Sequence, residues 1–278
     1  MSMTYGQLLQ DATGELVAAG IDDAAYDAFS LFEYVFHMNR AQYLVKSREE
    51  VGNSDKYLEL IKRRAGHEPL QYITGSQCFY GLDYYVDNRV LIPRYDTEVI
   101  VENILSVEKA DNLDVLDICT GSGCIAITLA SNRPSWKVTG SDISEGALEV
   151  SSINKEKLNV HNVSFVYSDL LGGIEGQFDI IVSNPPYIER KVIEGLNSEV
   201  KDHEPMIALC GGDDGLDLYK RIIKDAAGHL KAGGRLYFEI GYNQGQAVSE
   251  LLKEYGYNDI RVRQDLAGKD RMVSGSLN

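Results

Sequence analysis

Cysteine is scarce in this sequence, and the few cysteines lack the spacing of a metal site. The four of them form no Cys-x-x-Cys pair, and the five histidines are scattered along the chain. We therefore expect a chain with reduced thiols and no structural metal.

Long apolar runs are missing as well. No stretch of roughly 18 or more apolar residues occurs, and the first residues contain neither the basic nor the apolar region of a signal peptide. We expect a protein that is neither membrane-spanning nor secreted, and we assign it to the cytoplasm.

Positive charge is in short supply. The chain has 27 basic against 42 acidic residues and a formal net charge of −15. Because nucleic-acid binding requires many cationic contacts to phosphates, this balance disfavours a nucleic-acid partner, although a local basic patch stays possible. Lys62-Arg63-Arg64 is the only basic triplet, and we interpret it as the solvated face of a helix.

The rest of the composition suits a folded chain with a main domain and a smaller appendage, because 278 residues with 44% hydrophobic content can bury a sizeable core. Residues 3–66 carry apolar side chains at helical spacing, which predicts a small helical bundle. Its aromatic residues could form a partner-binding stripe, although we interpret them as core: Tyr26, Phe29, Phe32, Tyr34 and Phe36.

A change of pattern separates this bundle from the rest of the chain. Aromatic and β-branched residues broken by glycines predict a β-hairpin linker at residues 71–94. The predicted domains are therefore the helical bundle at 1–70, the linker at 71–94 and a main domain at 95–278.

Strands and helices alternate beyond residue 110, which predicts a doubly wound α/β sheet. The expected strands are 114–119, 136–142, 163–167, 178–183, 234–240, 259–264 and 271–274. The expected helices are 124–130, 144–158, 216–230 and 246–255.

Asn184-Pro185-Pro186-Tyr187 follows the buried strand 178–183, at the sheet edge where α/β proteins bind ligands. The Asn184 side-chain oxygen and the Pro185 carbonyl can accept both N–H bonds of a target –NH₂, and Tyr187 can stack on a flat target group. This favours methyl transfer to a planar nitrogen. The alternative is a strand that ends in a Pro-Pro turn with a satisfied Asn.

A cofactor site is indicated by the G-x-G-x-x-A motif from Gly121 to Ala126, with Asp142 about twenty residues further on. This pattern alone fits a dinucleotide-binding dehydrogenase, with Asp142 on a ribose hydroxyl. Asp117 favours S-adenosylmethionine instead, because a carboxylate in the preceding strand can meet a cofactor ammonium.

Four further residues are candidates for the same site. Asp169 can reach an adenine amino group with Leu170 against the ring, or the two can simply end a strand. Arg94 can hold a carboxylate or a substrate carbonyl, whereas Glu98 suits the first turn of the following helix.

Several motifs in this order resemble the HemK/PrmC protein-(glutamine-N5) methyltransferases over nearly the whole chain. The matching pieces are Glu68-Pro69-Leu70-Gln71-Tyr72-Ile73-x-Gly75, Val90-Leu91-Ile92-Pro93-Arg94-x-Asp96-Thr97-Glu98, Thr120-Gly121-Ser122-Gly123-Cys124, Val182-Ser183-Asn184-Pro185-Pro186-Tyr187-Ile188, Gly211-Gly212-x-Asp214-Gly215-Leu216 and Asp265-Leu266-Ala267-Gly268-x-Asp270-Arg271.

The resemblance implies a Rossmann-like, class I S-adenosylmethionine-dependent methyltransferase with a mostly parallel sheet, an antiparallel last strand and an N-terminal helical domain that docks the substrate. It implies methylation of the glutamine in the Gly-Gly-Gln motif of peptide-chain release factors, a step connected with translation termination. The residues expected to hold that glutamine are Asn184, Pro185, Pro186 and Tyr187, with Arg94 and Glu98 nearby. The residues expected to hold the cofactor are Asp117, Cys119, Thr120, Gly121, Ser122, Gly123, Asp142, Asp169, Leu170 and Asn184.

This sequence departs from the family pattern at three positions. Leu170 stands where an aromatic residue is expected, Cys119 where a glycine precedes Thr120, and Tyr95 where proline is common. Alternative functions are methylation of a ribosomal-protein glutamine, methylation of DNA adenine-N6, hydride transfer with NAD, and a binding module without catalysis.

Overall fold

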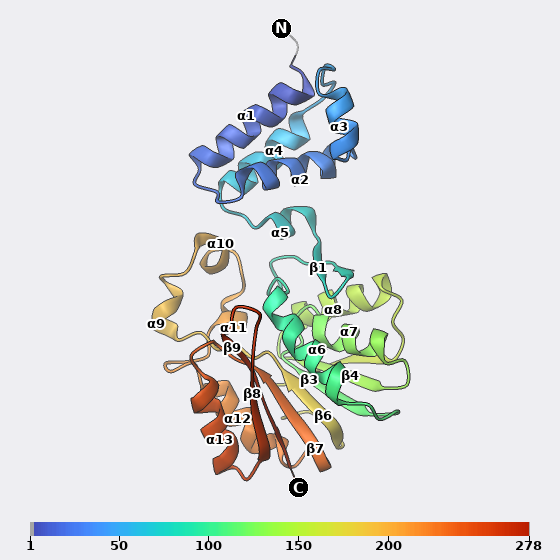
Figure 1. Ribbon diagram of the computed structural model, residues 1–278, viewed down its shortest axis with the longest axis vertical. Helices are drawn as coiled ribbons and strands as arrows, with labels where there is room; N and C mark the ends of the chain where they lie inside the picture. The colour runs from blue at the N-terminus through green and yellow to red at the C-terminus, as the bar shows by residue number, and fades with distance from the viewer. Residues whose placement is uncertain (1–2, 278) are drawn as a thin grey trace. The chain divides into compact units, whose positions relative to one another are not determined.

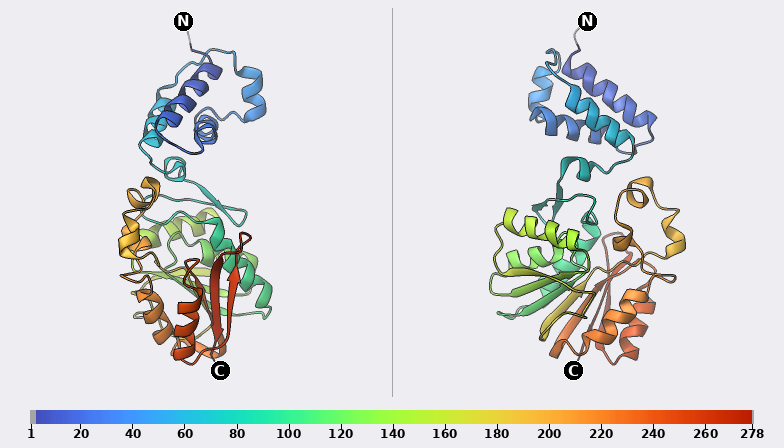
Figure 2. Two further views of the ribbon diagram at one scale, coloured as in Figure 1. Left: turned by 60° about the vertical axis from the view of Figure 1, so that its left-hand side comes forward. Right: turned by 180° about the vertical axis from the view of Figure 1, so that it is seen from behind.

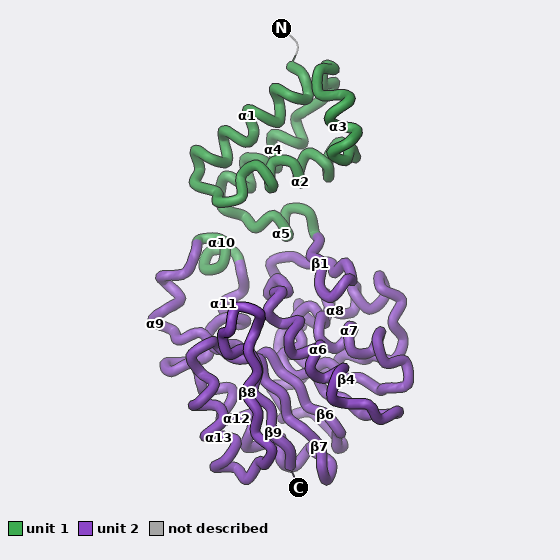
Figure 3. Tube along the Cα trace, in the orientation of Figure 1, with its two compact units in different colours: residues 1–75, 198–203 green, residues 76–197, 204–278 purple. Residues whose placement is uncertain are grey.

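The computed structural model describes residues 3–277, which divide into two compact units (Figure 3). One unit contains the chain up to Gly75 together with Ser198–His203, and the other contains Ser76–Asn197 and the chain from Glu204 onward. No helix within residues 3–277 has the length and apolarity required to cross a membrane.

The first unit is a helical bundle, as the sequence predicted (Figure 1). Its helices are α1 (Tyr5–Ala18), α2 (Ala24–Phe36), α3 (Arg40–Lys46), α4 (Asp55–Ala65), α5 (Leu70–Thr74) and α10 (Ser198–Lys201). Phe29 and Phe32 are buried in the bundle core, whereas Tyr26 and Tyr34 are exposed. The interpretation of the aromatic residues as core is therefore wrong for these two tyrosines.

A buried arginine connects three helices of this unit. The Arg64 guanidinium donates to Asp27 on α2 over 2.6 Å and also pairs with Glu199 on α10. Because both Arg64 and Asp27 are buried, losing either partner would leave an uncompensated charge in the core. The pair thus holds the segment around α10 against the bundle, although more than a hundred residues separate them in sequence.

The expected linker is correct only in part. Residues 71–75 were predicted as extended, but α5 forms there because Pro69 opens the helix and Gly75, with φ of 69°, closes it in the left-handed region. The hairpin itself pairs β1 (Gln77–Phe79) with β2 (Leu82–Tyr84). Its turn, Tyr80-Gly81, has two positive φ angles, which matches the twist of a tight hairpin.

The second unit contains a seven-stranded sheet in the order β5-β4-β3-β6-β7-β9-β8. The strands are β3 (Asp114–Ile118), β4 (Lys137–Asp142), β5 (Val163–Tyr167), β6 (Phe178–Ser183), β7 (Leu230–Glu239), β8 (Asn258–Gln264) and β9 (Asp270–Ser276). β3 to β7 run parallel, and β9 runs antiparallel to both of its neighbours. The strand order reverses between β3 and β6, which is where α/β sheets open a ligand crevice.

Helices cover both faces of this sheet (Figure 2). The helices that pack on the sheet are α6 (Glu98–Val107), α7 (Cys124–Asn132), α8 (Glu145–Lys157), α12 (Asp217–Ala226) and α13 (Gly245–Glu254). The same unit contains the 3₁₀ turn η1 (Tyr95–Thr97) and the short helices α9 (Arg190–Ile193) and α11 (Met206–Leu209). Ile180 and Val182 pack into the core that includes α6 and α7, and Ile181 packs into the core that includes α12. Strands buried on both faces read as continuous apolar runs, as β6 does.

Two parts of the second unit differ from the prediction. The helix expected to continue to Leu230 ends at Ala226, because Leu230 already pairs with Phe178 as the first residue of β7. The pairing then shifts register before Ile180, and this irregularity accommodates the glycines of β7. Short helices α9 and α11 were not predicted, since a single turn has too few residues to show periodicity.

Candidate active site

A cavity of about 310 Å³ lies in the second unit, at the carboxyl ends of the parallel strands. The predicted site residues that line it are Arg94, Cys119, Thr120, Gly121, Ser122, Asp142, Asp169, Leu170, Asn184 and Pro186. Five others are not part of its wall: Glu98, Asp117, Gly123, Pro185 and Tyr187. Most of the residues predicted for the site therefore lie together around one cavity, and the others lie outside its wall.

The loop between β3 and α7 forms one wall of the cavity. Cys119, Gly121 and Gly123 all have positive φ angles, of 60°, 54° and 79°. A Cβ atom at Gly123 would also stand about 3.0 Å from the Ile127 side chain, so this position requires glycine for both reasons. Cys119 adopts a conformation that suits glycine, and its side chain lines the cavity.

Asp117 is not among the residues that line the cavity, and the contact of its carboxylate with a cofactor stays a prediction. The side chain is fully buried, and Oδ2 accepts hydrogen bonds from the Thr120 hydroxyl (2.6 Å) and the Ala126 backbone N–H (3.2 Å). Burial raises the pKa of Asp117 to about 7. Its role in this structure is to hold the loop that lines the cavity.

Asp142 ends β4 and faces the cavity. One carboxylate oxygen accepts from the Gly121 backbone N–H (2.9 Å) and the other from the Ser144 N–H (2.9 Å). Each oxygen keeps a second lone pair, so the carboxylate can still accept from two neighbouring hydroxyls, as a ribose presents them. Burial raises the pKa of Asp142, while these backbone donors oppose the shift.

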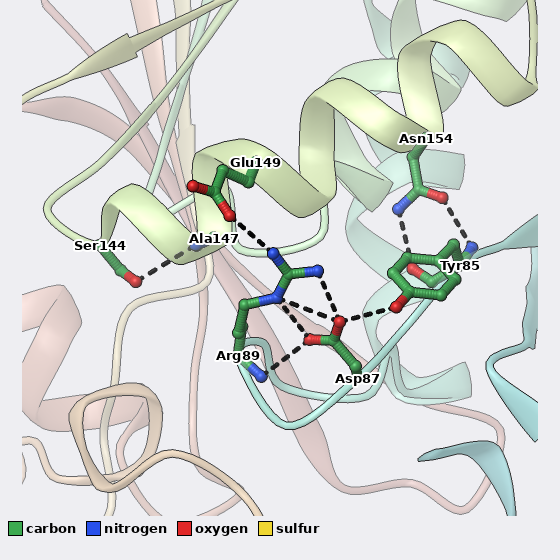
Figure 4. A network of polar contacts seen from close by, with 7 residues as sticks. All are labelled: Tyr85, Asp87, Arg89, Ser144, Ala147, Glu149 and Asn154. Carbon is green, nitrogen blue, oxygen red and sulfur yellow. Dashed lines mark hydrogen bonds and ion pairs between the residues drawn. The ribbon is translucent and has the colours of Figure 1, made fainter. Parts of the chain in front are cut away.

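An arginine that was not predicted, Arg89, also lines the cavity and lies beside α8 (Figure 4). Arg89 donates to Asp87 through Nε and Nη2, and Nη1 donates to Glu149 on α8 over 2.7 Å. Asn154, also on α8, hydrogen bonds with the backbone N–H and carbonyl of Tyr85. These contacts fix residues 85–89 against α8. The sequence alone offered no motif that would single out Arg89.

Asp169 and Leu170 follow β5 and also line the cavity. Asp169 forms an ion pair with Arg221 of α12, with both oxygens 2.9 Å from Nη2. Leu170 is buried and has φ of 54°, and its carbonyl accepts from the Ser168 hydroxyl. An apolar side chain beside an acidic group is an environment that suits a purine ring with its amino group.

Asn184 stands at the end of β6 with its side chain in the cavity wall. Its Nδ2 donates to the Thr97 hydroxyl over 3.4 Å, so the amide is held from the side of α6. Pro185 is buried behind the wall, and Tyr187 is anchored by its carbonyl, which accepts from Gln244 Nε2. The contact of Pro185 and Tyr187 with a substrate stays a prediction.

Gly211 fits closely against the same segment. Its N–H donates to the Ile188 carbonyl over 2.9 Å. A Cβ atom at this position would lie 2.7 Å from the Pro186 carbonyl oxygen and 2.7 Å from the Tyr187 Cα. Only glycine allows this approach of two backbones, which fixes the course of the chain after Asn184.

Arg94 and Glu98 have different environments. Arg94 lines the cavity and donates to the buried Glu204 carboxylate over 2.6 Å. Glu98 accepts from the Tyr80 backbone N–H over 2.8 Å, so it braces the β1–β2 hairpin. The structure thus places Arg94 where it can meet a ligand and Glu98 where it supports the fold.

These features fit S-adenosylmethionine. The cavity volume suits a nucleoside-sized ligand, Asp142 offers acceptors for a ribose, and the 119–122 loop lines the adjoining wall. With β9 inserted antiparallel between β7 and β8, the fold and the site define a Rossmann-like methyltransferase.

Comparison with known proteins gives the family. Residues 7–75 match the family model of the PrmC N-terminal domain, and residues 95–199 match that of the methyltransferase small domain. The release factor glutamine methyltransferase of Streptococcus pneumoniae (strain ATCC BAA-255 / R6) is 39% identical over 275 residues, which cover 98% of either chain. The chain belongs to the release factor glutamine methyltransferase family.

Solved structures show the same fold. A methyltransferase from Pyrococcus furiosus superposes with a TM-score of 0.54 at 19% identity. The matched region covers 81% of this chain and 98% of the Pyrococcus furiosus chain. A 16S rRNA N2 G1207 methyltransferase from T. thermophilus, solved in complex with AdoMet and guanosine, has a TM-score of 0.53 at 16% identity. Here the matched region covers 73% of this chain and 50% of the T. thermophilus chain. At these identities the likeness concerns the fold alone.

Proposed function

We propose that this chain transfers a methyl group from S-adenosylmethionine to the side-chain amide nitrogen of the glutamine in the Gly-Gly-Gln motif of peptide-chain release factors. Membership of the release factor glutamine methyltransferase family supports this proposal. The observation that carries it is the position of Asn184, which presents an amide at the end of β6 in the same cavity that Asp142 and Gly121 line.

The target amide is a weak nucleophile, because its nitrogen lone pair is delocalised into the carbonyl group. Asn184 Oδ1 and the Pro185 carbonyl accept hydrogen bonds from the two N–H groups of this amide and direct its lone pair toward the methyl donor. S-adenosylmethionine, when bound, supplies an electrophilic methyl group on a sulfonium. A new N–C bond forms as the S–C bond breaks, and the proton then leaves the cationic amide for solvent. No side chain has to act as a strong base.

The cavity wall divides between cofactor and substrate. Asp142 holds the ribose hydroxyls, the Thr120 to Ser122 loop holds the methionine portion, and Leu170 packs on the adenine. Asp169 is the acceptor proposed for the adenine amino group, and its ion pair with Arg221 keeps the carboxylate at the rim. Arg94 lies where a substrate carbonyl or carboxylate can meet it.

The helical unit is proposed as the docking surface for the release factor, and the reaction as a cytoplasmic one that serves translation termination. The formal net charge of −15 supports a protein partner over duplex nucleic acid, and we propose neither direct nucleic-acid binding nor membrane binding. A glutamine of a ribosomal protein is the second candidate substrate, since its planar side-chain amide has the same two N–H groups to be held as the release-factor glutamine.

A competition between acceptors tests this proposal. Radiolabelled S-adenosylmethionine is offered with the chain to a release factor, a ribosomal protein and DNA in parallel, and also to a release factor in which the Gly-Gly-Gln glutamine is replaced by asparagine. We expect label only on the unaltered release factor. Label on DNA or on the ribosomal protein alone would contradict the proposal, as would calorimetry that shows binding of NAD but none of S-adenosylmethionine.

A further inference from the structure

Glu239 is a buried carboxyl group that none of the roles above uses. It ends β7 and is only 2% exposed. Ser183 of β6 pairs with Phe238 of β7, so the next residues, Asn184 and Glu239, lie side by side at the sheet edge. Since side chains alternate along a strand, both project to the face that carries Val182 and Tyr237.

The Thr97 and Asn184 side chains are the polar neighbours of the Glu239 carboxyl, and both act to lower its pKa. Its second oxygen, Oε2, is buried without a partner. Thr97 precedes α6 in the N-cap position but makes no side-chain capping bond, and it is 2% exposed. Its hydroxyl therefore serves this cluster, where it also accepts from Asn184 Nδ2.

The hydrogen bond from Nδ2 to the Thr97 hydroxyl, beside Glu239, indicates which way the Asn184 amide faces. A primary amide presents two N–H donors on one atom and an acceptor oxygen on the other. A carboxylate can only accept, so the neighbouring Glu239 can hold the –NH₂ group of Asn184 but not its oxygen. With Nδ2 donating to Thr97, Oδ1 is left for the cavity that Asn184 lines.

We propose that Glu239 is a positioning residue whose carboxylate fixes the Asn184 amide with Oδ1, and not Nδ2, toward the target amide. The inference rests on the proposed function, because an acceptor in this place is needed only if the substrate offers N–H donors. A reversed Asn184 would present its own N–H groups to the substrate N–H groups, and the target nitrogen could not be held.

The ionisation of Glu239 adds a second consequence. Burial raises the pKa of Glu239 to about 7, although the neighbouring Thr97 hydroxyl and the positive charge of Arg271 both lower it. Protonation converts the carboxylate into an O–H donor. The Asn184 amide can then rotate by about 180° so that its Oδ1 accepts a hydrogen bond from Glu239. Turnover should therefore fall as the pH drops through about 7. The titratable groups facing Glu239 from the elements around it are Asp96, Cys124, Tyr187, Tyr219 and Arg271.

The first experiment compares wild type with Glu239→Gln and with the control Glu108→Gln. Glu108 accepts from the hydroxyl of Tyr237, two residues earlier on β7, and lies outside the cavity wall. We expect kcat of Glu239→Gln to fall about 100-fold with unchanged affinity for S-adenosylmethionine, and the remaining kcat no longer to decrease at low pH. Glu108→Gln should keep both the wild-type kcat and its decrease at low pH. Wild-type kcat in Glu239→Gln, or a loss of cofactor affinity in parallel with kcat, would overturn the proposal.

A second measurement is independent of turnover. The side-chain ¹⁵N–¹H₂ resonances of Asn184, identified by their loss in Asn184→Ala, are followed against pH in wild type and in Glu239→Gln. We expect them to titrate with a midpoint near 7 in wild type and to stay unchanged in the variant. Resonances that do not titrate in wild type would overturn the positioning role even if methyl transfer occurs. Titration in a chain that transfers no methyl group would instead leave this role standing and overturn the proposed function.

Discussion

At the scale of single residues, two non-glycine residues of the site, Cys119 and Leu170, have a positive φ angle, which their side chains do not favour. Cys119 has φ of 60°, where the Cβ atom of an L-residue is crowded and glycine is not. The sequence showed that cysteine replaces a glycine here, but the sign of φ came from the structure. We infer that this chain carries local strain at the first residue of the cofactor loop.

Two substitutions at this position separate strain from packing. Cys119→Gly and Cys119→Ala both remove the thiol, but only glycine relieves the backbone. We expect the glycine variant to be more stable than the alanine variant by about 1 kcal/mol in urea denaturation. Equal stability of the two variants, or an advantage for alanine, would show that the loop is not strained at this residue.

Asp142 carries the most specific predicted contact to the cofactor. Asp142→Asn keeps one acceptor oxygen for Gly121 or Ser144 and loses the negative charge, so ribose hydroxyls are held less well. We expect the Kd of S-adenosylmethionine to rise about tenfold or more, measured by calorimetry. The control is Asp169→Asn, at an exposed ion pair, which should change the Kd less. A larger effect at Asp169 would reverse our assignment.

At the scale of elements, the bounds of the strands β3 to β6 were predicted to within one residue, because each lies between a turn and a helix or loop that the sequence also marks. α5 was missed because its five residues contain aromatic and β-branched side chains that also suit a strand. Asp117 was placed at the cofactor because a carboxylate near a glycine loop suggests a ligand. Its full burial depends on the packing of α7 over β3, which the sequence does not encode locally.

The close approach of Gly211 to the segment after β6 gives a test at this scale. In Gly211→Ala the new Cβ would meet the Pro186 carbonyl oxygen, so the segment that follows Asn184 must shift. We expect kcat to fall at least about tenfold and the melting temperature to drop.

The matched control for Gly211→Ala is Gly14→Ala in α1. Gly14 is exposed, and a Cβ atom at this position would meet no other part of the chain within 4 Å. Alanine should therefore raise stability by about 0.5–1 kcal/mol through helix propensity alone. Unchanged kcat in Gly211→Ala would show that the segment tolerates displacement.

At the scale of the whole molecule, the chain enters the helical unit twice, and only the first passage was predictable. Residues 198–203 join the helices through the pair between Arg64 and Glu199, whereas the segments on either side belong to the unit with the cavity. No periodic pattern marks so short a segment. A pairing between distant charges is visible only in three dimensions.

The buried carboxyl of Glu239 also affects the stability of the whole fold. Its folded-state pKa of about 7 exceeds its ordinary value of 4.5, so the folded chain binds this proton more tightly than the unfolded chain. The stabilising contribution of this group is present at low pH and is lost as the pH rises through about 7.

Glu239→Gln should therefore be more stable than wild type at pH 8, by at most about 3 kcal/mol, with the advantage gone near pH 4. Denaturation curves across this range measure the difference, with Glu108→Gln as the control. A variant that is less stable than wild type at pH 8 would show that the carboxylate is stabilised by its neighbours more than burial disfavours it.

The central claim is that acceptor oxygens at the end of β6 grip the target amide. The most direct measurement is the single-turnover rate of methyl transfer to a release factor by Asn184→Ala, together with the Kd of S-adenosylmethionine. We predict a rate reduced about 100-fold or more with a Kd within about twofold of wild type. A variant that methylates the release factor at the wild-type rate would contradict the account.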